Sequence, residues 1–231
     1  MRRIETEADI AEGLQALARL DPRLEPVIAE ASEIPLRRSE GGFAAMVSII
    51  AAQQISRASA DAILARFTRL VDPLDAATVL ACGEEAFRQA GMSRPKQATL
   101  MTLARAIVEG ELDLDTLTDL SAEEARERLT AIRGIGPWTA DVYLLIAAGH
   151  ADVFPAGDVA LQGAVADALG LDARPTIREL TAMAESWSPW RSVAARLFWA
   201  HWRKWAGARC SAGSRDSRSG CKIKVMPEHS L

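Results

Sequence analysis

Apolar residues recur at every third or fourth position along nearly the whole chain. Ile10, Leu14, Leu17 and Leu20 form one such stretch. This spacing places apolar side chains on one face of a helix, and no window shows the alternation of β-branched residues that is typical of a strand. We therefore predict an all-α protein, with helices near residues 6–20, 23–31, 42–55, 57–70, 75–81, 84–90, 95–109, 121–131, 137–148, 158–169, 176–186 and 190–206.

Polar residues and glycines mark several ends of these predicted helices. Ser121 and Glu124 have the spacing of a capping box, and Gly170 stands where a glycine ends a helix. Beyond Gly207 the chain turns to Ser, Gly and Arg without periodicity. Residues 207–231 are therefore predicted to form a disordered tail.

The composition excludes several classes of protein. With 231 residues, 49% of them hydrophobic, the chain can bury a sizeable core. No stretch reaches the roughly 20 apolar residues needed to cross a bilayer, so we expect no membrane partner and a place in the bacterial cytoplasm, with the chromosomal DNA. The 3 cysteines and 3 histidines are too scattered for a disulfide framework or a zinc site. No metal and no cofactor is expected.

The net charge of −4 argues mildly against a protein that coats nucleic acid. The charges are unevenly distributed, however. Acidic residues crowd into two stretches, 5–33 and 109–127, whereas basic residues prevail over residues 174–209. One basic face is therefore compatible with a local DNA contact.

The most informative stretch is LTAIRGIGPWTAD, residues 129–141, where one predicted helix gives way to another across two glycines. Gly134 and Gly136 permit unusual backbone conformations and a close approach to the amides. The next helix begins at Pro137, so its N–H groups and dipole favour an anion there. The pair alone is also compatible with an ordinary helix end. The alternative is a turn that grips a DNA phosphate.

The full string resembles the hairpin of the helix-hairpin-helix-GPD superfamily of DNA glycosylases, and Trp-Thr-Ala resembles its 3-methyladenine DNA glycosylase II branch. The resemblance implies two helical lobes with a central cleft in a domain over residues 1–206. Residues of about 42–150 would form one lobe, and residues 1–41 with 151–206 the other. It implies a compact form without the N-terminal β-rich domain of larger members. The implied DNA contacts here are Arg133, Gly134, Ile135, Gly136 and Thr139.

The resemblance extends to DVFPAGDVALQ, residues 152–162, similar to the family's segment in which a final Asp opens a helix and is catalytic. Asp158 matches that position. An Asp in this place is also a common helix N-cap, and the two roles are compatible. A carboxylate at a helix N-terminus suits the stabilisation of an oxocarbenium-like sugar or the orientation of a water molecule.

Two departures from other family branches narrow the predicted chemistry. Bifunctional relatives carry a nucleophilic Lys where this chain has Trp138, and an indole cannot attack C1′ of the sugar. Other branches carry four close cysteines for an iron–sulfur cluster, which this chain lacks. The resemblance therefore implies a monofunctional, cluster-free enzyme.

The base pocket and the wedge are also assigned through the resemblance. Trp138 and Trp190 match pocket aromatics, and Tyr143 is a further substrate-binding candidate. The helical spacing of Trp199, Trp202 and Trp205 instead favours core positions. In IIAAQQIS, residues 49–56, the match makes Gln54 the wedge that fills the gap left by a flipped base. Its neighbour Gln53, together with Ser93 and Lys96, completes the predicted DNA contacts.

These interpretations predict a monomer that removes alkylated bases, 3-methyladenine above all and 7-methylguanine next, from double-stranded DNA. Two alternatives remain at this point. A uracil or mismatch glycosylase on the same scaffold would offer amide hydrogen bonds to a neutral base. A non-catalytic helix-hairpin-helix DNA-binding module would need the hairpin but would have no use for Asp158.

Overall fold

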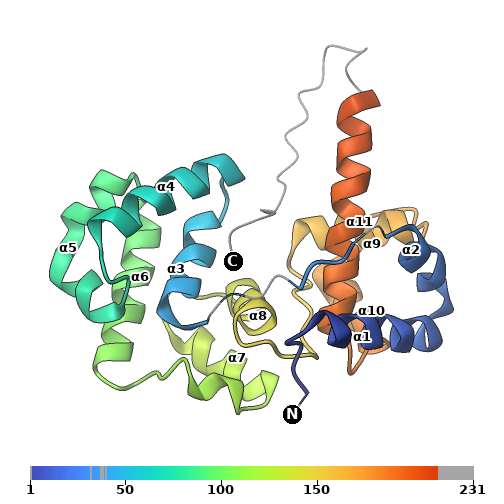
Figure 1. Cartoon of the computed structure of the whole chain (residues 1–231), viewed down its shortest axis with the longest axis horizontal. Helices are drawn as coiled ribbons and strands as arrows, with labels where there is room; N and C mark the ends of the chain where they lie inside the picture. The colour runs from blue at the N-terminus through green and yellow to red at the C-terminus, as the bar shows by residue number, and fades with distance from the viewer. Residues whose placement is uncertain (1, 32, 37–38, 40, 213–231) are drawn as a thin grey trace. The chain divides into compact units, whose positions relative to one another are not determined.

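The computed structural model describes residues 2–31, 33–36, 39 and 41–212. Over these residues the chain forms eleven α-helices and two short 3-10 helices, and no strand (Figure 1). This confirms the prediction of an all-α protein. No helix in the described part is long and apolar enough to cross a membrane.

Over the described residues, the chain forms two compact units, one within residues 37–150 and the other made of residues within 2–36 and 151–212. The first unit contains α3 (Gly42–Ala52), α4 (Arg57–Leu70), α5 (Ala76–Ala90), α6 (Arg94–Val108), the 3-10 turn Thr116–Thr118, α7 (Ala122–Ala131) and α8 (Pro137–Ile146). The second contains α1 (Glu7–Leu20), the 3-10 turn Pro22–Leu24, α2 (Glu25–Glu30), α9 (Val159–Ala168), α10 (Ile177–Glu185) and α11 (Arg191–Ala212).

The core of the first unit is built on α3 and α8, which pack against each other (Figure 1). Both helices are apolar on nearly every side, which is the pattern of a helix covered all round by others. Met46, Val47 and Ile50 of α3 are buried, and so is every residue of α8 from Thr139 to Ile146. The hairpin before α8 is therefore attached to the buried core of this unit.

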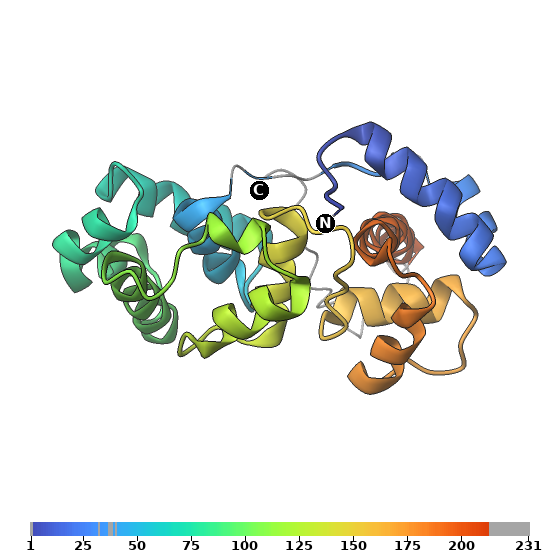
Figure 2. The same ribbon diagram turned by 90° about the horizontal axis from the view of Figure 1, so that it is seen from below.

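The core of the second unit is built on α11, which has α1 on one side and α9 on another (Figures 1 and 2). Val193, Leu197 and Phe198 of α11 are fully buried. Gly13 allows α1 to approach closely, because a Cβ atom there would lie 2.6 Å from a methyl group of Val193. Helix α11 thus contacts the elements on both sides and fixes their positions.

The predicted helix ends agree with the structure within a few residues, and the capping box at Ser121 and the glycine end at Gly170 are confirmed. The expected helix over 42–55 ends at Ala52, because Gln53 is extended at ψ 130°. The short turn at residues 116–118 was not expected. Helix α11 continues to Ala212 rather than ending near 206, and residues 213–231 of the predicted tail lie outside the described residues.

The buried Asp21 carboxylate pairs with the exposed Arg23 and joins the end of α1 to Trp187 in the chain before α11. The Asp21 carboxylate accepts two hydrogen bonds from the Arg23 guanidinium, both at 2.8 Å, and one from the Trp187 indole N–H at 3.0 Å. The Arg23 guanidinium holds the pKa of the Asp21 carboxyl below its usual value. This network stabilises the second unit at every pH at which the Asp21 carboxyl is ionised.

We expect Asp21→Asn to lower the free energy of unfolding at pH 7 by about 1.5–3 kcal/mol, since a buried charged hydrogen bond is lost. A pKa lowered on folding gives stability above the unfolded value of about 3.9, and that stability disappears as the pH falls through the folded value. The difference between wild type and variant should therefore shrink at pH 3. Urea unfolding at both pH values measures this, and an undiminished difference at pH 3 would contradict it.

Candidate functional site

Asp158 is the N-cap of α9, and its side chain is buried, with 5% of the residue exposed. Its Oδ1 accepts hydrogen bonds from the backbone N–H groups of Ala160 at 2.9 Å and Leu161 at 3.0 Å. The indole N–H of Trp199 approaches the same oxygen at 3.4 Å. Since a carboxylate is costly to bury without partners, these donors explain how it is held inside the second unit.

The chain that leads into Asp158 makes a tight, buried turn. The backbone N–H of Asp158 donates to the carbonyl of Pro155 at 2.8 Å. One turn into α9, the buried Gln162 side chain donates from Nε2 to the carbonyl of Ala156 at 3.0 Å. The start of α9 therefore holds the Asp158 carboxylate, and hydrogen bonds from Asp158 and Gln162 hold the turn before it.

Trp199 is the aromatic residue that contacts Asp158, and the sequence analysis assigned it to the core. It is indeed buried, with 2% of the residue exposed. Its proximity to Asp158 arises because α11 packs along α9, which brings together residues 41 positions apart. Helical spacing showed that Trp199 faces inward, but spacing cannot show which buried group a tryptophan meets.

Trp190, predicted to bind substrate, packs inside the second unit. The residue is 5% exposed, and the Arg2 guanidinium carbon lies 4.0 Å from the centroid of its ring. A Cβ atom on Gly13 would lie 2.8 Å from the same indole. One face of the Trp190 ring is therefore covered by a cation, and the ring packs on α1.

Tyr143, also predicted to bind substrate, is buried in the first unit. Tyr143 is 2% exposed, and its hydroxyl accepts a hydrogen bond from the N–H of Gly42 at 3.1 Å. Burial raises the pKa of this phenol to about 12. Its ring packs in the core of the first unit, and its hydroxyl ties α8 to the start of α3.

The two hairpin glycines are needed for different reasons. Gly134 has a φ of 98°, and a Cβ atom there would lie 2.1 Å from Oγ1 of Thr99 on α6. Gly136, the N-cap of α8, has a φ of −91° and no atom within 4 Å of the position that a Cβ would take. The fold therefore requires a glycine at 134, whereas packing and backbone conformation leave room for a side chain at 136.

The hairpin tip is held between α7 and α8 by Ile135. This residue is 3% exposed, and its N–H donates to the carbonyl of Ile132 at 3.0 Å. The Ile135 side chain is thus turned into the unit. The neighbouring Arg133 and Gly134 are exposed.

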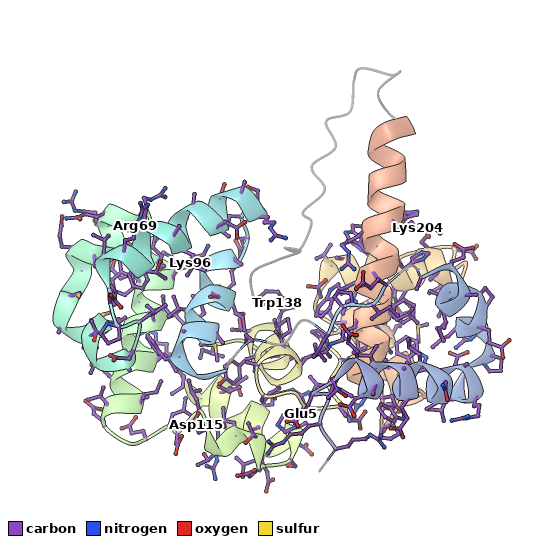
Figure 3. All side chains as sticks on the ribbon, viewed as in Figure 1. Glu5, Arg69, Lys96, Asp115, Trp138 and Lys204 are labelled. Carbon is purple, nitrogen blue, oxygen red and sulfur yellow. The ribbon has the colours of Figure 1, made fainter. Side chains whose placement is uncertain are left out.

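The loop after α3 is tied to both the hairpin helix and α6. Gln53 donates from Nε2 to the hydroxyl of Thr139 on α8 at 2.8 Å, and Lys96 donates from Nζ to the carbonyl of Ala51 at 2.7 Å. A lysine at the C-terminus of a helix is favoured by the helix dipole. Figure 3 shows Lys96 on α6 and Trp138 at the start of α8, with α3 between their helices.

Gln54 stands at the tip of this loop and is exposed. It is the one non-glycine residue with a positive φ in the described chain, at 60°. Such a conformation costs roughly 1–3 kcal/mol and is found disproportionately at functional sites. Ser93, the exposed N-cap of α6, makes no side-chain capping bond, and Trp138 is half-buried.

The predicted contacts of the first unit thus gather around three joined elements: the hairpin, the loop after α3 and the start of α6. Gln53 and Thr139 touch directly, Lys96 is bound to the end of α3, and Gly134 lies against α6. In the second unit, Asp158 and Trp199 form a compact pair. The candidate functional residues thus form two clusters, one in each unit.

A tight glycine hairpin between two helices and a buried N-capping carboxylate downstream define a class of DNA repair proteins. Residues 47–191, which include both features, match the family model described as HhH-GPD superfamily base excision DNA repair protein. The chain belongs to the HhH-GPD superfamily.

One similar relative is a probable bifunctional transcriptional activator/DNA repair enzyme AlkA of Mycobacterium tuberculosis, 32% identical over 210 residues. The match covers 86% of this chain and 41% of that protein. This chain spans about two fifths of the length of the curated relatives that it matches in this way.

Two solved structures resemble the described fold over most of both chains. One is a DNA-3-methyladenine glycosidase from Bacillus halodurans, with a TM-score of 0.76, 29% identity, and coverage of 90% of this chain and 95% of that one. The other is the 3-methyladenine DNA glycosylase Mag1 of Schizosaccharomyces pombe in complex with abasic DNA, with a TM-score of 0.74, 26% identity, and coverage of 83% and 95%.

Proposed function

We propose that this chain is a monofunctional DNA glycosylase that removes alkylated bases from duplex DNA in base excision repair. Its substrates are 3-methyladenine first and 7-methylguanine second. The observation that carries the proposal is the buried Asp158 carboxylate, held by two backbone N–H groups of α9 and approached by the Trp199 indole N–H. The names of the similar proteins support the choice of alkylated bases.

Asp158 stabilises the sugar as the glycosidic bond breaks. The bond electrons leave with the base, and positive charge develops at C1′ and the ring oxygen of the deoxyribose. A fixed negative charge beside them lowers the barrier, because it acts without having to reorganise. Water then bonds to C1′ and gives up a proton, which leaves an abasic sugar in an unbroken strand.

An indole ring suits the base that this reaction expels. Stacking of a base on an aromatic side chain contributes roughly 1–3 kcal/mol, and a cationic base gains about 0.5–2 kcal/mol more from the ring's electron-rich face. Purines alkylated at N3 or N7 are cationic, whereas normal bases are neutral. Trp138, half-buried at the start of α8, is the candidate for this contact.

The first unit provides the grip on duplex DNA. The backbone at Gly136 and the start of α8 would bind a phosphate, because helix N-termini favour anions and the space in front of Gly136 is open. Exposed Arg133 and Ser93 would add phosphate contacts. Gln54, held in a strained conformation at an exposed tip, would enter the stack where the base has left it.

The full chain should release 3-methyladenine from methylated duplex DNA in a buffer that contains a metal chelator. Chromatography of the freed bases measures the product. The strand should stay intact until alkali or a separate lyase is added, because the carboxylate mechanism forms no Schiff base. Nicks in the untreated product would contradict the monofunctional mechanism, and release of uracil without methylated purines would contradict the substrate class.

A further inference from the structure

Three successive residues before Asp158 are attached to the start of α11. Buried Ser192 makes two hydrogen bonds through its hydroxyl, accepting from the N–H of Val153 at 3.1 Å and donating to the carbonyl of the same residue at 3.0 Å. Its backbone N–H donates to the carbonyl of Ala151 at 2.9 Å. One residue of α11 therefore holds the backbone on both sides of Asp152.

Asp152 itself is bound from the same end of α11. Its carboxylate accepts hydrogen bonds from Nε of Arg191 at 2.6 Å and from Nη2 of Arg191 at 2.9 Å. This bidentate contact fixes the distance between the two side chains and their relative orientation. The hydroxyl of Ser188 adds a third bond at 2.8 Å. The side chains of Asp152 and Arg191 are each 31% exposed, so water screens the pair only in part.

The same helix also reaches the carboxylate of Asp158. Trp199 follows Ser192 by seven positions, which is about two turns of an α-helix. Helix α11 thus contacts the segment at residues 151–153 and again at Asp158. Because a helix is rigid over two turns, its attachment to Asp152 determines where the Trp199 indole lies relative to Asp158.

We propose that Asp152 and Arg191 are a positioning pair for Asp158: their contact sets α11 against the 151–158 segment so that Trp199 meets the carboxylate. This inference rests on the proposed function. It assigns to the pair an effect on the chemical step in addition to any effect on folding. Neither residue needs to touch the base or the sugar.

The pair can be tested without any catalytic assay. In protein labelled with ¹⁵N-tryptophan, the 6 indole N–H groups give separate signals, and Trp199→Phe identifies the one from Trp199. We expect Asp152→Asn to shift the Trp199 signal, because the hydrogen bond to Asp158 changes. If the Trp199 signal of a folded Asp152→Asn protein keeps its wild-type position, the proposal is wrong.

Asp167→Asn is the matched control. Oδ2 of Asp167 lies 2.7 Å from Nε2 of His201, and this contact also joins α9 to α11. The Asp167 side chain is 34% exposed, close to the exposure of Asp152. Asp167 lies near the C-terminal end of α9, whereas Asp158 caps its N-terminal end. The Trp199 signal should therefore keep its position in Asp167→Asn. A shift as large as in Asp152→Asn would overturn the proposal, because it would show that any weakened contact between α9 and α11 moves the signal.

Where Asp152→Asn fails to fold, Arg191→Lys replaces it, because lysine keeps the charge but loses the bidentate geometry. The Trp199 signal should move in this variant too, and an unmoved signal would overturn the proposal.

Base release gives the second readout. With enzyme in excess and DNA saturated, Asp152→Asn should release base about ten- to a hundredfold more slowly, the range expected for a small misplacement of a reacting group. DNA affinity and the rate of Asp167→Asn should stay close to wild type. A wild-type rate in Asp152→Asn would contradict the positioning role. If the wild type itself releases no base, the proposed function fails, while the indole signals still decide whether the pair positions Asp158.

Discussion

The Asp158→Asn protein is expected to fold, to bind DNA and to release methylated bases at least about a hundredfold more slowly than the wild type. Asparagine keeps the size of the side chain and most of its capping ability, so α9 should begin at the same residue. The negative charge that faces the developing oxocarbenium ion is lost. Removing such electrostatic support typically costs about 2.7–4 kcal/mol in the barrier. The release of free base with enzyme in excess measures the effect.

Asp75→Asn is the matched control for this variant. Asp75 is also an N-cap, of α5, and its carboxylate accepts a backbone hydrogen bond from Thr78 at 2.8 Å. The exchange is chemically the same, but Asp75 belongs to neither of the two clusters described above. Base release should therefore be unchanged, and an equal loss in both variants would assign the effect of Asp158→Asn to capping.

Replacing the two hairpin glycines with alanine should affect different properties: stability at Gly134 and DNA affinity at Gly136. Gly134→Ala places a Cβ atom 2.1 Å from Oγ1 of Thr99 at a φ of 98°. Overpacking and backbone strain together should lower the free energy of unfolding by about 2–5 kcal/mol. Gly136→Ala meets open space at an ordinary φ, so stability should hardly change. Its methyl group would instead obstruct a phosphate, and DNA affinity should fall about tenfold.

Urea unfolding and a DNA-binding titration on each variant separate these effects. Adding Thr99→Ala to Gly134→Ala removes two of the atoms that clash and should recover part of the lost stability. The loss of affinity in Gly136→Ala should be the same for duplexes of different sequence, since a phosphate contact carries no base information. Normal affinity in that variant would show that the space before α8 holds no phosphate.

The fold was predictable because its signals are local. The three- to four-residue periodicity and caps such as Ser121 depend on neighbouring residues, and the structure shows the helices they predict. Asp158 was recognisable for a similar reason: the turn that places it and the helix that it caps lie within a few residues of it. Its catalytic role remains a proposal.

The contacts of the aromatic side chains could not be predicted from the sequence, because they depend on long-range packing. Trp190 lies near the matching motif in sequence, yet its ring packs under Arg2 and against Gly13. Trp199 had the pattern of a core residue and is buried, but the packing of α11 on α9 brings it to Asp158. Sequence spacing shows which face of a helix is buried, whereas only the packing of helices shows which distant residue that face meets.

The central claim is that the buried carboxylate at the start of α9 supports cleavage of the glycosidic bond. Its most direct test is single-turnover release of 3-methyladenine by wild type, Asp158→Asn and Asp75→Asn, beside a binding titration on the same methylated duplex. We predict that only Asp158→Asn slows release, by at least about a hundredfold, while all three proteins bind within a few-fold of one another. Near-normal release by a folded Asp158→Asn protein would contradict the claim.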